Sequence, residues 1–444
     1  MRGFLASSIG VTCAAALALP LTLPAAAAPA PAPAVQPASG ARSASTTAAP
    51  DLPGSTQSLP LTPRTRDRTL GAAPEQGLTR ADVHRFSLVG VTWTDPDTEL
   101  RGQVQVRTRA TGTGEWSGWQ DIDTHNEDHG ADPGTAERDS GHVHGSTAPL
   151  WVGDSDGVDV RVRATGAATR TAGVVEEQLP PLPTGLHLEL VDPGAAEAPL
   201  AGVGATTNRN RTATPRLAAT EIPALSKQAT ERDMVALGAK AQPYIGPRPR
   251  IVTRHGWGAD EKLREKGFVY TKKVKAAFVH HTATGNNYRC SQAPSVIRGI
   301  YRYHVKSSGW RDIGYNFLVD KCGTIYEGRA GGVAKAVMGA HTLGFNTNSM
   351  GIAVLGTFGS AKPSSAAVTA IAKLTAWKLG LYGVNPRGKT YLKSGGGNLY
   401  RKGKNVRLNV ISGHRDGFAT ECPGRQLYGK LGSARSTSAR YQGR

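Results

Sequence analysis

The stretch Asn409-Val410-Ile411-Ser412-Gly413-His414-Arg415-Asp416-Gly417-Phe418-Ala419-Thr420-Glu421-Cys422-Pro423-Gly424 organises the chain. It continues an apolar run at residues 406–411 and places the imidazole of His414 eight residues before the thiol of Cys422. These two side chains are soft ligands that suit Zn²⁺. They do not make a catalytic site alone, because a catalytic zinc takes three protein ligands and keeps one position open for water.

A candidate third ligand lies far upstream, in Ala276-Ala277-Phe278-Val279-His280-His281-Thr282-Ala283-Thr284. Its four apolar residues predict a buried strand, and His280 stands at the C-terminal end of that strand, where sheet proteins commonly carry functional residues. A histidine in such a place is more often a surface or hydrogen-bonded residue than a ligand. The residues alone therefore leave both interpretations open.

Five motifs then occur in a characteristic order. They are Val279-His280-His281-Thr282-Ala283, Gly309-Trp310-Arg311-Asp312-Ile313-Gly314-Tyr315-Asn316-Phe317, Tyr326-Glu327-Gly328-Arg329, Gly339-Ala340-His341-Thr342, and Gly413-His414-Arg415-Asp416 with Glu421-Cys422-Pro423-Gly424. In this order they resemble the peptidoglycan recognition proteins, a family similar to the zinc N-acetylmuramoyl-L-alanine amidases of phage-lysozyme type. Strands and helices are also intermixed here, so we expect residues 249–431 to form an α/β domain, with a mixed sheet packed against helices.

The resemblance implies a metal centre with one Zn²⁺ in this domain. The ion would be held by His280, His414 and the thiolate of Cys422. The phenol of Tyr315 would lie near the metal and donate a hydrogen bond to the water and to the developing oxyanion.

Three further positions carry roles by the same resemblance. Thr420 stands where phage enzymes have Lys and many recognition proteins have Thr, and its hydroxyl is expected to orient water or substrate without offering a positive charge. His341 is expected along the muropeptide groove, and Arg329 is expected to bind substrate. Residues 330–336 lack a Gly-Trp pair that many relatives carry, which leaves the stem-peptide preference undecided.

Two functions compete at this point. The first is a secreted zinc amidase that cuts the bond between N-acetylmuramic acid and L-alanine in peptidoglycan. The second is a peptidoglycan-binding protein without turnover, as in relatives that lack the thiol ligand. All three ligand types are present at matching positions, so the pattern favours the enzyme.

The cysteines agree with the zinc interpretation. Without Cys13, which lies in an N-terminal leader, the chain keeps Cys290, Cys322 and Cys422, and an odd number in an exported protein indicates a thiol with another task. A disulfide between Cys290 and Cys322 would leave Cys422 free as a ligand. The alternative pairings would use that ligand up, so we expect the Cys290–Cys322 bridge.

The N-terminal residues predict export. Residues 1–28 combine an early Arg2, an apolar run and a small-residue stretch, which is typical of a secretory signal peptide. Residues 29–66 are rich in Ala, Pro, Ser and Thr and are expected to be disordered, because they bury too little apolar surface. No later stretch is apolar for long enough to span a bilayer. We expect a secreted protein that is extracellular or associated with the cell wall.

Residues 69–194 predict a second kind of domain. Short runs alternate apolar with polar residues, a period of two that indicates antiparallel strands and an all-β, sandwich-like domain of unknown ligand. Trp116 and Trp119 are expected to pack in its core, the alternative being an exposed platform for sugars. The insert at residues 121–146 is rich in Asp, His and Gly, but it lacks metal-ligand spacing, so we expect a solvated loop.

Composition predicts the remaining segments and the charge distribution. Residues 195–248 are expected to be a linker with a short helix near residues 227–237, and residues 432–444 a basic tail. Residues 250–444 carry 32 Lys and Arg against 8 Asp and Glu, whereas residues 1–249 carry 21 against 26. This positive field favours polyanions such as wall polymers. No nucleic-acid motif accompanies it, so we expect no nucleic-acid partner.

Overall fold

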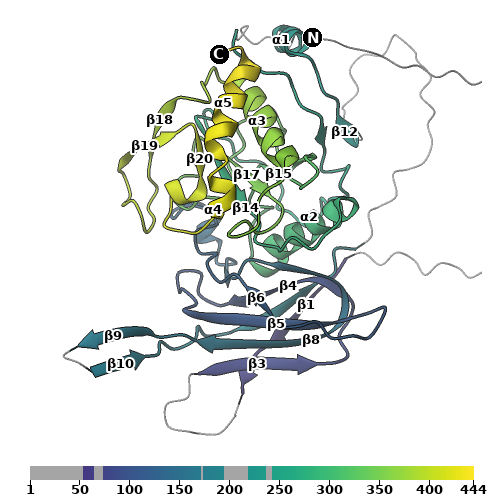
Figure 1. Ribbon diagram of the computed structural model, residues 1–444, viewed down its shortest axis with the longest axis vertical. Coiled ribbons are helices and arrows are strands. Elements are labelled where there is room, and N and C mark those ends of the chain that lie inside the picture. Colours follow the sequence, from purple (N-terminus) through teal and green to yellow (C-terminus); the bar gives the residue numbers. More distant parts are fainter. Residues whose placement is uncertain (1–53, 65–73, 172–173, 195–218, 237–242) are drawn as a thin grey trace, which may run out of the picture. The chain divides into compact units, whose positions relative to one another are not determined.

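The computed structural model describes residues 54–64, 74–171, 174–194, 219–236 and 243–444. The expected signal peptide at residues 1–28 lies outside the described residues, as do most of the segment 29–66 and residues 195–218 and 237–242 of the expected linker. Within the described part, an N-terminal all-β domain is followed by a C-terminal α/β domain (Figure 1).

The N-terminal domain is built from antiparallel strands. They are β1 (Thr56–Pro60), β2 (Thr62–Pro63), β3 (Glu75–Arg80), β4 (Phe86–Trp93), β5 (Gly102–Ala110), β6 (Gln120–Ile122), β7 (Gly145–Ser146), β8 (Leu150–Ala164), β9 (Ala167–Thr171), β10 (Val174–Gln178) and β11 (His187–Val191), with a short 3₁₀ turn η1 (Arg138–Ser140).

The long strand β8 joins two groups of strands. Its first half pairs with β4, and its second half pairs with β3 and β5. Inward-facing Val, Leu and Phe side chains of these strands form one buried core, which includes Phe86, Val104 and Val160. Burial of alternate residues confirms the antiparallel all-β prediction for this region.

The C-terminal domain has one mixed sheet in the order β12-β13-β16-β15-β17-β14-β20. Its strands are β12 (Glu221–Ile222), β13 (Ile251–Val252), β14 (Ala276–His281), β15 (Phe317–Val319), β16 (Ile325–Glu327), β17 (Ser349–Val354) and β20 (Ile411–Gly413), and β18 (Lys389–Lys393) pairs with β19 (Asn405–Asn409) in a separate hairpin. The helices are α1 (Lys227–Ala236), α2 (Ala293–Arg302), α3 (Ser365–Gly380), α4 (Arg425–Tyr428) and α5 (Leu431–Gln442), with short turns η2 (Cys290–Gln292), η3 (Tyr303–Ser307) and η4 (His414–Asp416).

The central strands of this sheet are buried because helices cover it. β14 is buried at every residue and runs parallel to both β17 and β20. Ser364 directly precedes helix α3, and its side chain accepts a hydrogen bond from the Ala367 amide, as an N-cap serine does. The parallel arrangement brings the C-terminal ends of β14 and β20 to the same edge, which places His281 and Gly413 there.

The two domains share an apolar interface. Leu88 and Trp151 of the β domain belong to the same buried cluster as Ile297 and Ile300 of α2. A side chain at position 90 would collide with Tyr303, because a Cβ on Gly90 would overlap the Tyr303 hydroxyl and ring. This close packing joins the β domain to α2 and to η3, which directly follows it.

Parts of the segments predicted to be disordered, a linker and a basic tail form regular structure. Strand β1 falls within the segment expected to be disordered and pairs with β11. Part of the expected linker carries β12, which extends the C-terminal sheet, and α1, which is the short helix predicted there. The expected basic tail forms α5, which packs its Leu431 and Ala434 into the core beside α3. Each gains hydrogen bonds and burial from a partner that is remote in sequence.

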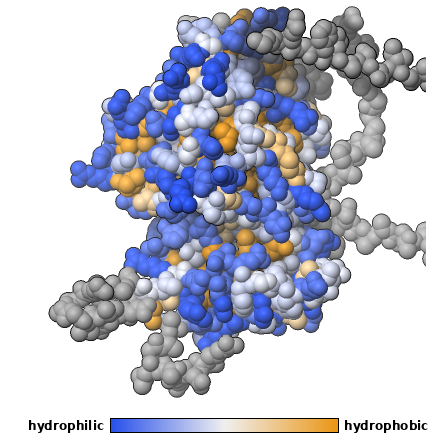
Figure 2. Space-filling model, viewed as in Figure 1, coloured by the Kyte–Doolittle hydropathy of each residue, from blue (hydrophilic) through white to orange (hydrophobic). Residues whose placement is uncertain are grey.

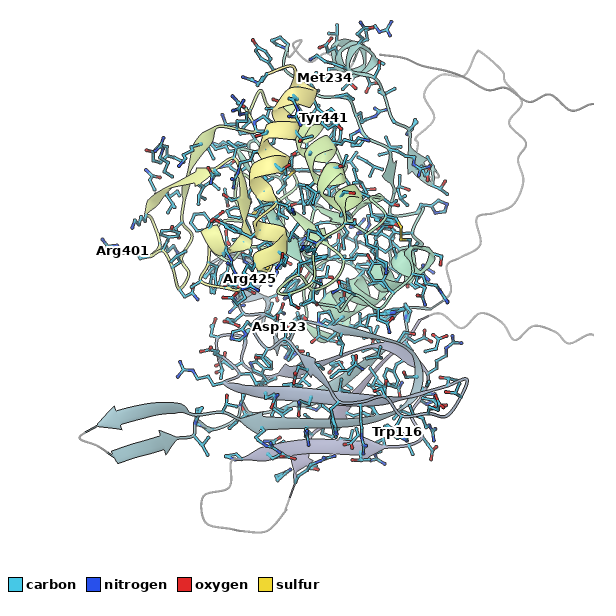
Figure 3. The ribbon with its side chains drawn as sticks, in the orientation of Figure 1. Trp116, Asp123, Met234, Arg401, Arg425 and Tyr441 are labelled. Carbon is cyan, nitrogen blue, oxygen red and sulfur yellow. A yellow bond between two sulfur atoms is a disulfide. The ribbon has the colours of Figure 1, made fainter. Side chains whose placement is uncertain are left out.

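Trp116 and Trp119 do not pack in the β-domain core, so that prediction is wrong. Trp116 is 39% exposed on the sheet surface (Figure 3), and the Arg107 guanidinium lies 5.4 Å from its ring centroid and 5.1 Å from that of Trp119. The Arg161 guanidinium lies 4.2 Å from the ring centroid of Trp119. The core positions of β5 belong to Val104 and Val106 instead, and the tryptophans cover arginine side chains through cation–π contacts.

Surface hydropathy and helix composition both bear on whether a segment could cross a membrane. The face shown in Figure 2 is mostly hydrophilic, with apolar residues in small areas. Among the described residues, none of the helices combines the length and the apolar character that a membrane crossing requires.

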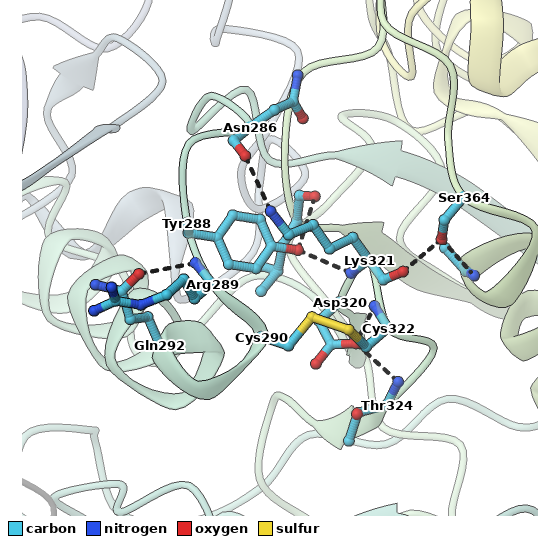
Figure 4. Close-up of a disulfide and its surroundings, with 12 residues drawn as sticks. Asn286, Tyr288, Arg289, Cys290, Gln292, Asp320, Lys321, Cys322, Thr324 and Ser364 are labelled. Carbon is cyan, nitrogen blue, oxygen red and sulfur yellow. Dashed lines mark hydrogen bonds between the residues drawn. A yellow bond between two sulfur atoms is a disulfide. The ribbon is translucent and has the colours of Figure 1, made fainter.

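The expected disulfide between Cys290 and Cys322 is present (Figure 4). It joins the turn before α2 to the turn between β15 and β16. Asp320 supports that turn, because its carboxylate accepts hydrogen bonds from the amides of Cys322 and Thr324, both at 2.9 Å.

Removing this bridge is expected to destabilise the protein. The bond closes a sequence separation of 32 residues, for which loss of the constraint on the unfolded chain costs about 2–4 kcal/mol. The Cys290→Ser/Cys322→Ser double variant should therefore show a lower free energy of unfolding in urea. Reduced wild-type protein should show the same decrease, and an unchanged midpoint in both would contradict the prediction.

Candidate metal centre

Two histidines and one cysteine meet at the edge where β14 and β20 end. The Nδ1 atoms of His280 and His414 lie 3.1 Å apart, and the Sγ atom of Cys422 lies 3.8 Å from His280 Nδ1. A tetrahedral zinc with ordinary bond lengths separates two nitrogen ligands by roughly 3.3 Å and a nitrogen from a sulfur ligand by roughly 3.6 Å. The three predicted ligand atoms therefore have the spacing that Zn²⁺ requires.

Local structure explains how Cys422 reaches this edge. His414 begins the short turn η4 directly after β20, and the chain then loops back so that the Arg415 amide donates to the Cys422 carbonyl at 3.0 Å. The Asp416 carboxylate accepts a hydrogen bond from the Gly413 amide at 2.9 Å. These bonds close the loop and hold the sulfur beside the two imidazoles.

The far nitrogens of both imidazoles have partners that fix the rings. His280 Nε2 lies 3.3 Å from His341 Nδ1 and 3.4 Å from the Thr342 hydroxyl. His414 Nε2 lies 3.1 Å from the backbone carbonyl of Asp128, to which it donates. Such partners are typical around metal-binding histidines, because they select the tautomer whose other nitrogen faces the ion.

A fourth possible ligand comes from the β domain. One donor atom from each of His129, His280, His414 and Cys422 lies within 4.8 Å of the others, and all four side chains are buried. His129 Nδ1 is paired with the Asp128 carboxylate at 2.6 Å, whereas His129 Nε2 is buried without any hydrogen-bond partner. A buried imidazole nitrogen with no partner is costly unless it binds something, so it fits a metal ligand.

Burial sets the protonation of the cluster. It lowers the pKa of His280 well below 6.5 and the pKa of His414 to about 3, so both rings are neutral as ligands must be. It also raises the pKa of the Cys422 thiol well above 9. The sulfur therefore keeps its proton until a cation binds and releases it.

Tyr315 and Thr420 lie beside the cluster, as the resemblance implies. Both line a small cavity of about 10 Å³ together with Cys422 and His129. Burial raises the pKa of the Tyr315 phenol well above 10, so this hydroxyl remains a donor. The Thr420 hydroxyl accepts a hydrogen bond from the Cys422 amide at 3.1 Å.

The two residues expected to contact substrate have other partners. His341 is fully buried behind His280 and supports that ring, rather than facing an open groove. Arg329 is also buried, and its guanidinium forms two hydrogen bonds, at 2.8 and 2.9 Å, with the Glu137 carboxylate. In this structure neither side chain is accessible to a ligand.

The insert at residues 121–146 is not a solvated loop, and that prediction is wrong. Asp128, His129, Asp132 and Glu137 within it are all buried. Asp123, at its start, lies where the β domain meets the C-terminal domain (Figure 3). No spacing rule signals His129, because its partner ligands are about 150 and more residues away; the adjacent pair Asp128-His129 was the one local cue.

A mixed sheet with a His-His-Cys cluster at its strand ends defines an α/β domain with a candidate metal site. The family model for N-acetylmuramoyl-L-alanine amidase matches residues 270–425, and the model described as Rv3811 N-terminal galactose-binding domain-like matches residues 41–181. The chain belongs to the peptidoglycan recognition protein family, which confirms the resemblance seen in the motifs.

Two relatives support this assignment by their sequences. Peptidoglycan-recognition protein SC2 of Drosophila simulans is 31% identical over 183 residues, which cover 41% of this chain and 84% of that protein. Peptidoglycan-recognition protein SC1a of Drosophila melanogaster is 33% identical over 192 residues, or 42% and 87% of the two chains. Among solved structures, wild-type PGRP-LB of Drosophila is 25% identical with a TM-score of 0.33, covering 41% of this chain and 92% of that one.

Proposed function

We propose that the C-terminal domain is a zinc-dependent amidase that hydrolyses the bond between N-acetylmuramic acid and L-alanine in peptidoglycan. The observation that carries this proposal is the convergence of His280 Nδ1, His414 Nδ1 and Cys422 Sγ at one sheet edge. A Zn²⁺ bound there would act as a Lewis acid and lower the pKa of a water molecule to about 7.

The protein's own residues orient the reaction. Support from Thr342 and His341 holds the His280 ring in place. Tyr315 offers a protonated phenol beside the ligands, which can donate to the oxygen of the scissile amide as negative charge develops on it. Thr420 lines the same cavity and offers a neutral hydroxyl that can position water or substrate.

Replacing Tyr315 by phenylalanine is expected to slow the chemical step. Removing one oxyanion donor typically costs about 10²–10³-fold in kcat, because the donor acts mainly in the transition state. KM should change little. Steady-state kinetics on a soluble muropeptide measures both constants, and a variant that raises KM without lowering kcat would show that the phenol only binds substrate.

The remaining alternative is a protein that binds peptidoglycan without turnover. The burial of the cluster favours this alternative, because His280, His414 and Cys422 do not face solvent. Both functions would use the basic C-terminal domain to approach a negatively charged wall. We further propose that the protein is secreted, since both functions require access to the wall.

The deciding experiment compares two full-length proteins, wild type and His129→Ala, because His129 shares the metal cluster. Each is loaded with zinc or stripped with a chelator and incubated with purified muropeptides, and free stem peptide is detected by mass spectrometry. Zinc-dependent product from either protein supports the amidase. Binding of muropeptide without product from either protein supports the recognition function instead.

A further inference from the structure

The insert at residues 121–146 leaves the β domain after β6 and returns to it at β7. Its segment at residues 128–137, in which residues 128–132 and Glu137 are buried, contacts the C-terminal domain at three separate places. These contacts are the metal cluster, the loop at residues 342–346 and the Arg329 side chain.

The first contact supplies a complete set of zinc ligands. Asp128 holds His129 Nδ1, so that His129 Nε2 carries the free lone pair within the cluster. With His280, His414 and Cys422, this nitrogen makes four protein donors. Four protein ligands are the mark of a closed zinc site, whereas a hydrolytic zinc keeps the fourth position for water.

The second contact fastens the insert next to the cluster. The Asp132 carboxylate accepts hydrogen bonds from the Gly344 amide and from the Asn346 side chain, both at 2.7 Å. The backbone carbonyl of Asp128 accepts from the Leu343 amide at 2.9 Å as well as from His414. The insert is therefore hydrogen-bonded both to His414 and to the loop at residues 342–346.

The third contact is a buried ion pair. Glu137 and Arg329 have side chains that are 3% and 5% exposed, and they are joined by two hydrogen bonds. Arg329 is the residue that the motifs assign to substrate. The Glu137 carboxylate therefore pairs with the Arg329 guanidinium in the way that a carboxylate of a stem peptide would.

The space that remains excludes substrate. The cavity beside Tyr315 and Cys422 has a volume of about 10 Å³. That is roughly the space of a single water molecule. A muropeptide cannot reach the cluster while the insert stays in place.

We propose that the insert of the β domain is an autoinhibitory segment, in which His129 closes the zinc site as its fourth ligand while Asp132 and Glu137 hold the segment over the substrate positions. This inference rests on the proposed amidase function and adds its regulation. The full chain is latent, and displacing the insert opens both the metal and Arg329 together.

Cobalt spectroscopy tests the closed site without relying on activity. Co²⁺ replaces Zn²⁺ in full-length wild type, in His129→Ala and in the control His142→Ala, which removes an exposed histidine of the same insert. We expect azide to change the visible spectrum of His129→Ala, which gains an open position, and to leave wild type and His142→Ala unchanged. A wild-type spectrum that responds to azide as strongly as that of His129→Ala would overturn the proposal.

Activity measurements test whether the insert inhibits hydrolysis. His129→Ala, loaded with zinc, is expected to release stem peptide at least tenfold faster than wild type, and His142→Ala is expected to match wild type. A second variant replaces residues 127–144 by a short Gly-Ser linker. Such a linker can join the two ends of the insert because they lie close together, with Asn126 Nδ2 3.2 Å from the Ser146 hydroxyl. This variant should be at least as fast as His129→Ala, and its fold is checked by near-UV circular dichroism.

The two proposals fail in different ways. If neither variant exceeds wild type while wild type itself hydrolyses muropeptides, the insert is no inhibitor and this inference is overturned. If no protein hydrolyses muropeptides but the azide contrast holds, the amidase proposal fails and the four-ligand site stands.

Discussion

Cys422→Ser is expected to abolish zinc-dependent hydrolysis, with a loss of at least about 10³-fold in whichever form of the protein is active. A serine hydroxyl is a far poorer zinc ligand than a thiolate, because zinc is borderline-soft and the hydroxyl does not ionise at neutral pH. Cys422 is also the only free cysteine among the described residues, so no nearby sulfur can replace it. Combined with His129→Ala, which leaves only the two imidazoles of His280 and His414, Cys422→Ser should lower the zinc content below one ion per chain after dialysis.

Two measurements check this expectation. Metal analysis after dialysis gives the stoichiometry, and mass spectrometry of muropeptides gives the product. The Cys290→Ser/Cys322→Ser variant is the matched control, because it also removes sulfur but leaves the cluster intact. Full hydrolysis by Cys422→Ser would eliminate the proposed metal centre, whatever the reaction turned out to be.

Glu137→Gln is expected to loosen the insert by about 3 kcal/mol or more. The substitution leaves the Arg329 guanidinium buried without a countercharge, and breaking one partner of a buried ion pair typically costs about 3–5 kcal/mol. The insert can relieve this cost by detaching. We therefore expect the loss to appear first as local opening rather than as global unfolding.

Hydrogen exchange on two amides outside the insert reports this opening. The amides of Leu343 and Gly344 donate to Asp128 and Asp132, so they exchange when the insert leaves. Their protection should fall by about 10²-fold or more in Glu137→Gln, the equivalent of about 3 kcal/mol. Asp139→Asn, an exposed carboxylate two residues away, should change protection very little. Equal protection in both variants would show that the ion pair does not hold the insert.

Much of the C-terminal domain could be predicted because its signals are local. The apolar run before His280 became β14, and the apolar positions before His414 became β19 and β20. Motif order then brought His280, His414 and Cys422 into one hypothesis, and the structure places their donor atoms within ligand spacing.

The errors concern side chains whose surroundings come from distant residues. Alternation along a strand shows that one face is apolar, but it did not reveal that arginines on the other face would stack against Trp116 and Trp119. His341 stays a predicted substrate contact, but its packing against the His280 ring joins residues that are 61 positions apart. Neither outcome follows from spacing along the chain.

The sequence by itself predicted a mixed sheet packed against helices, the disulfide and three candidate metal ligands, because periodicity, cysteine number and ordered motifs are properties of the chain. Only the tertiary structure decided that the insert at residues 121–146 packs against the C-terminal domain. Its Asp, His and Glu side chains have no periodicity, and each is buried by residues from another domain. A buried charge or an unpartnered imidazole is stable only when its partner is present, and that partner is set by how the two domains pack.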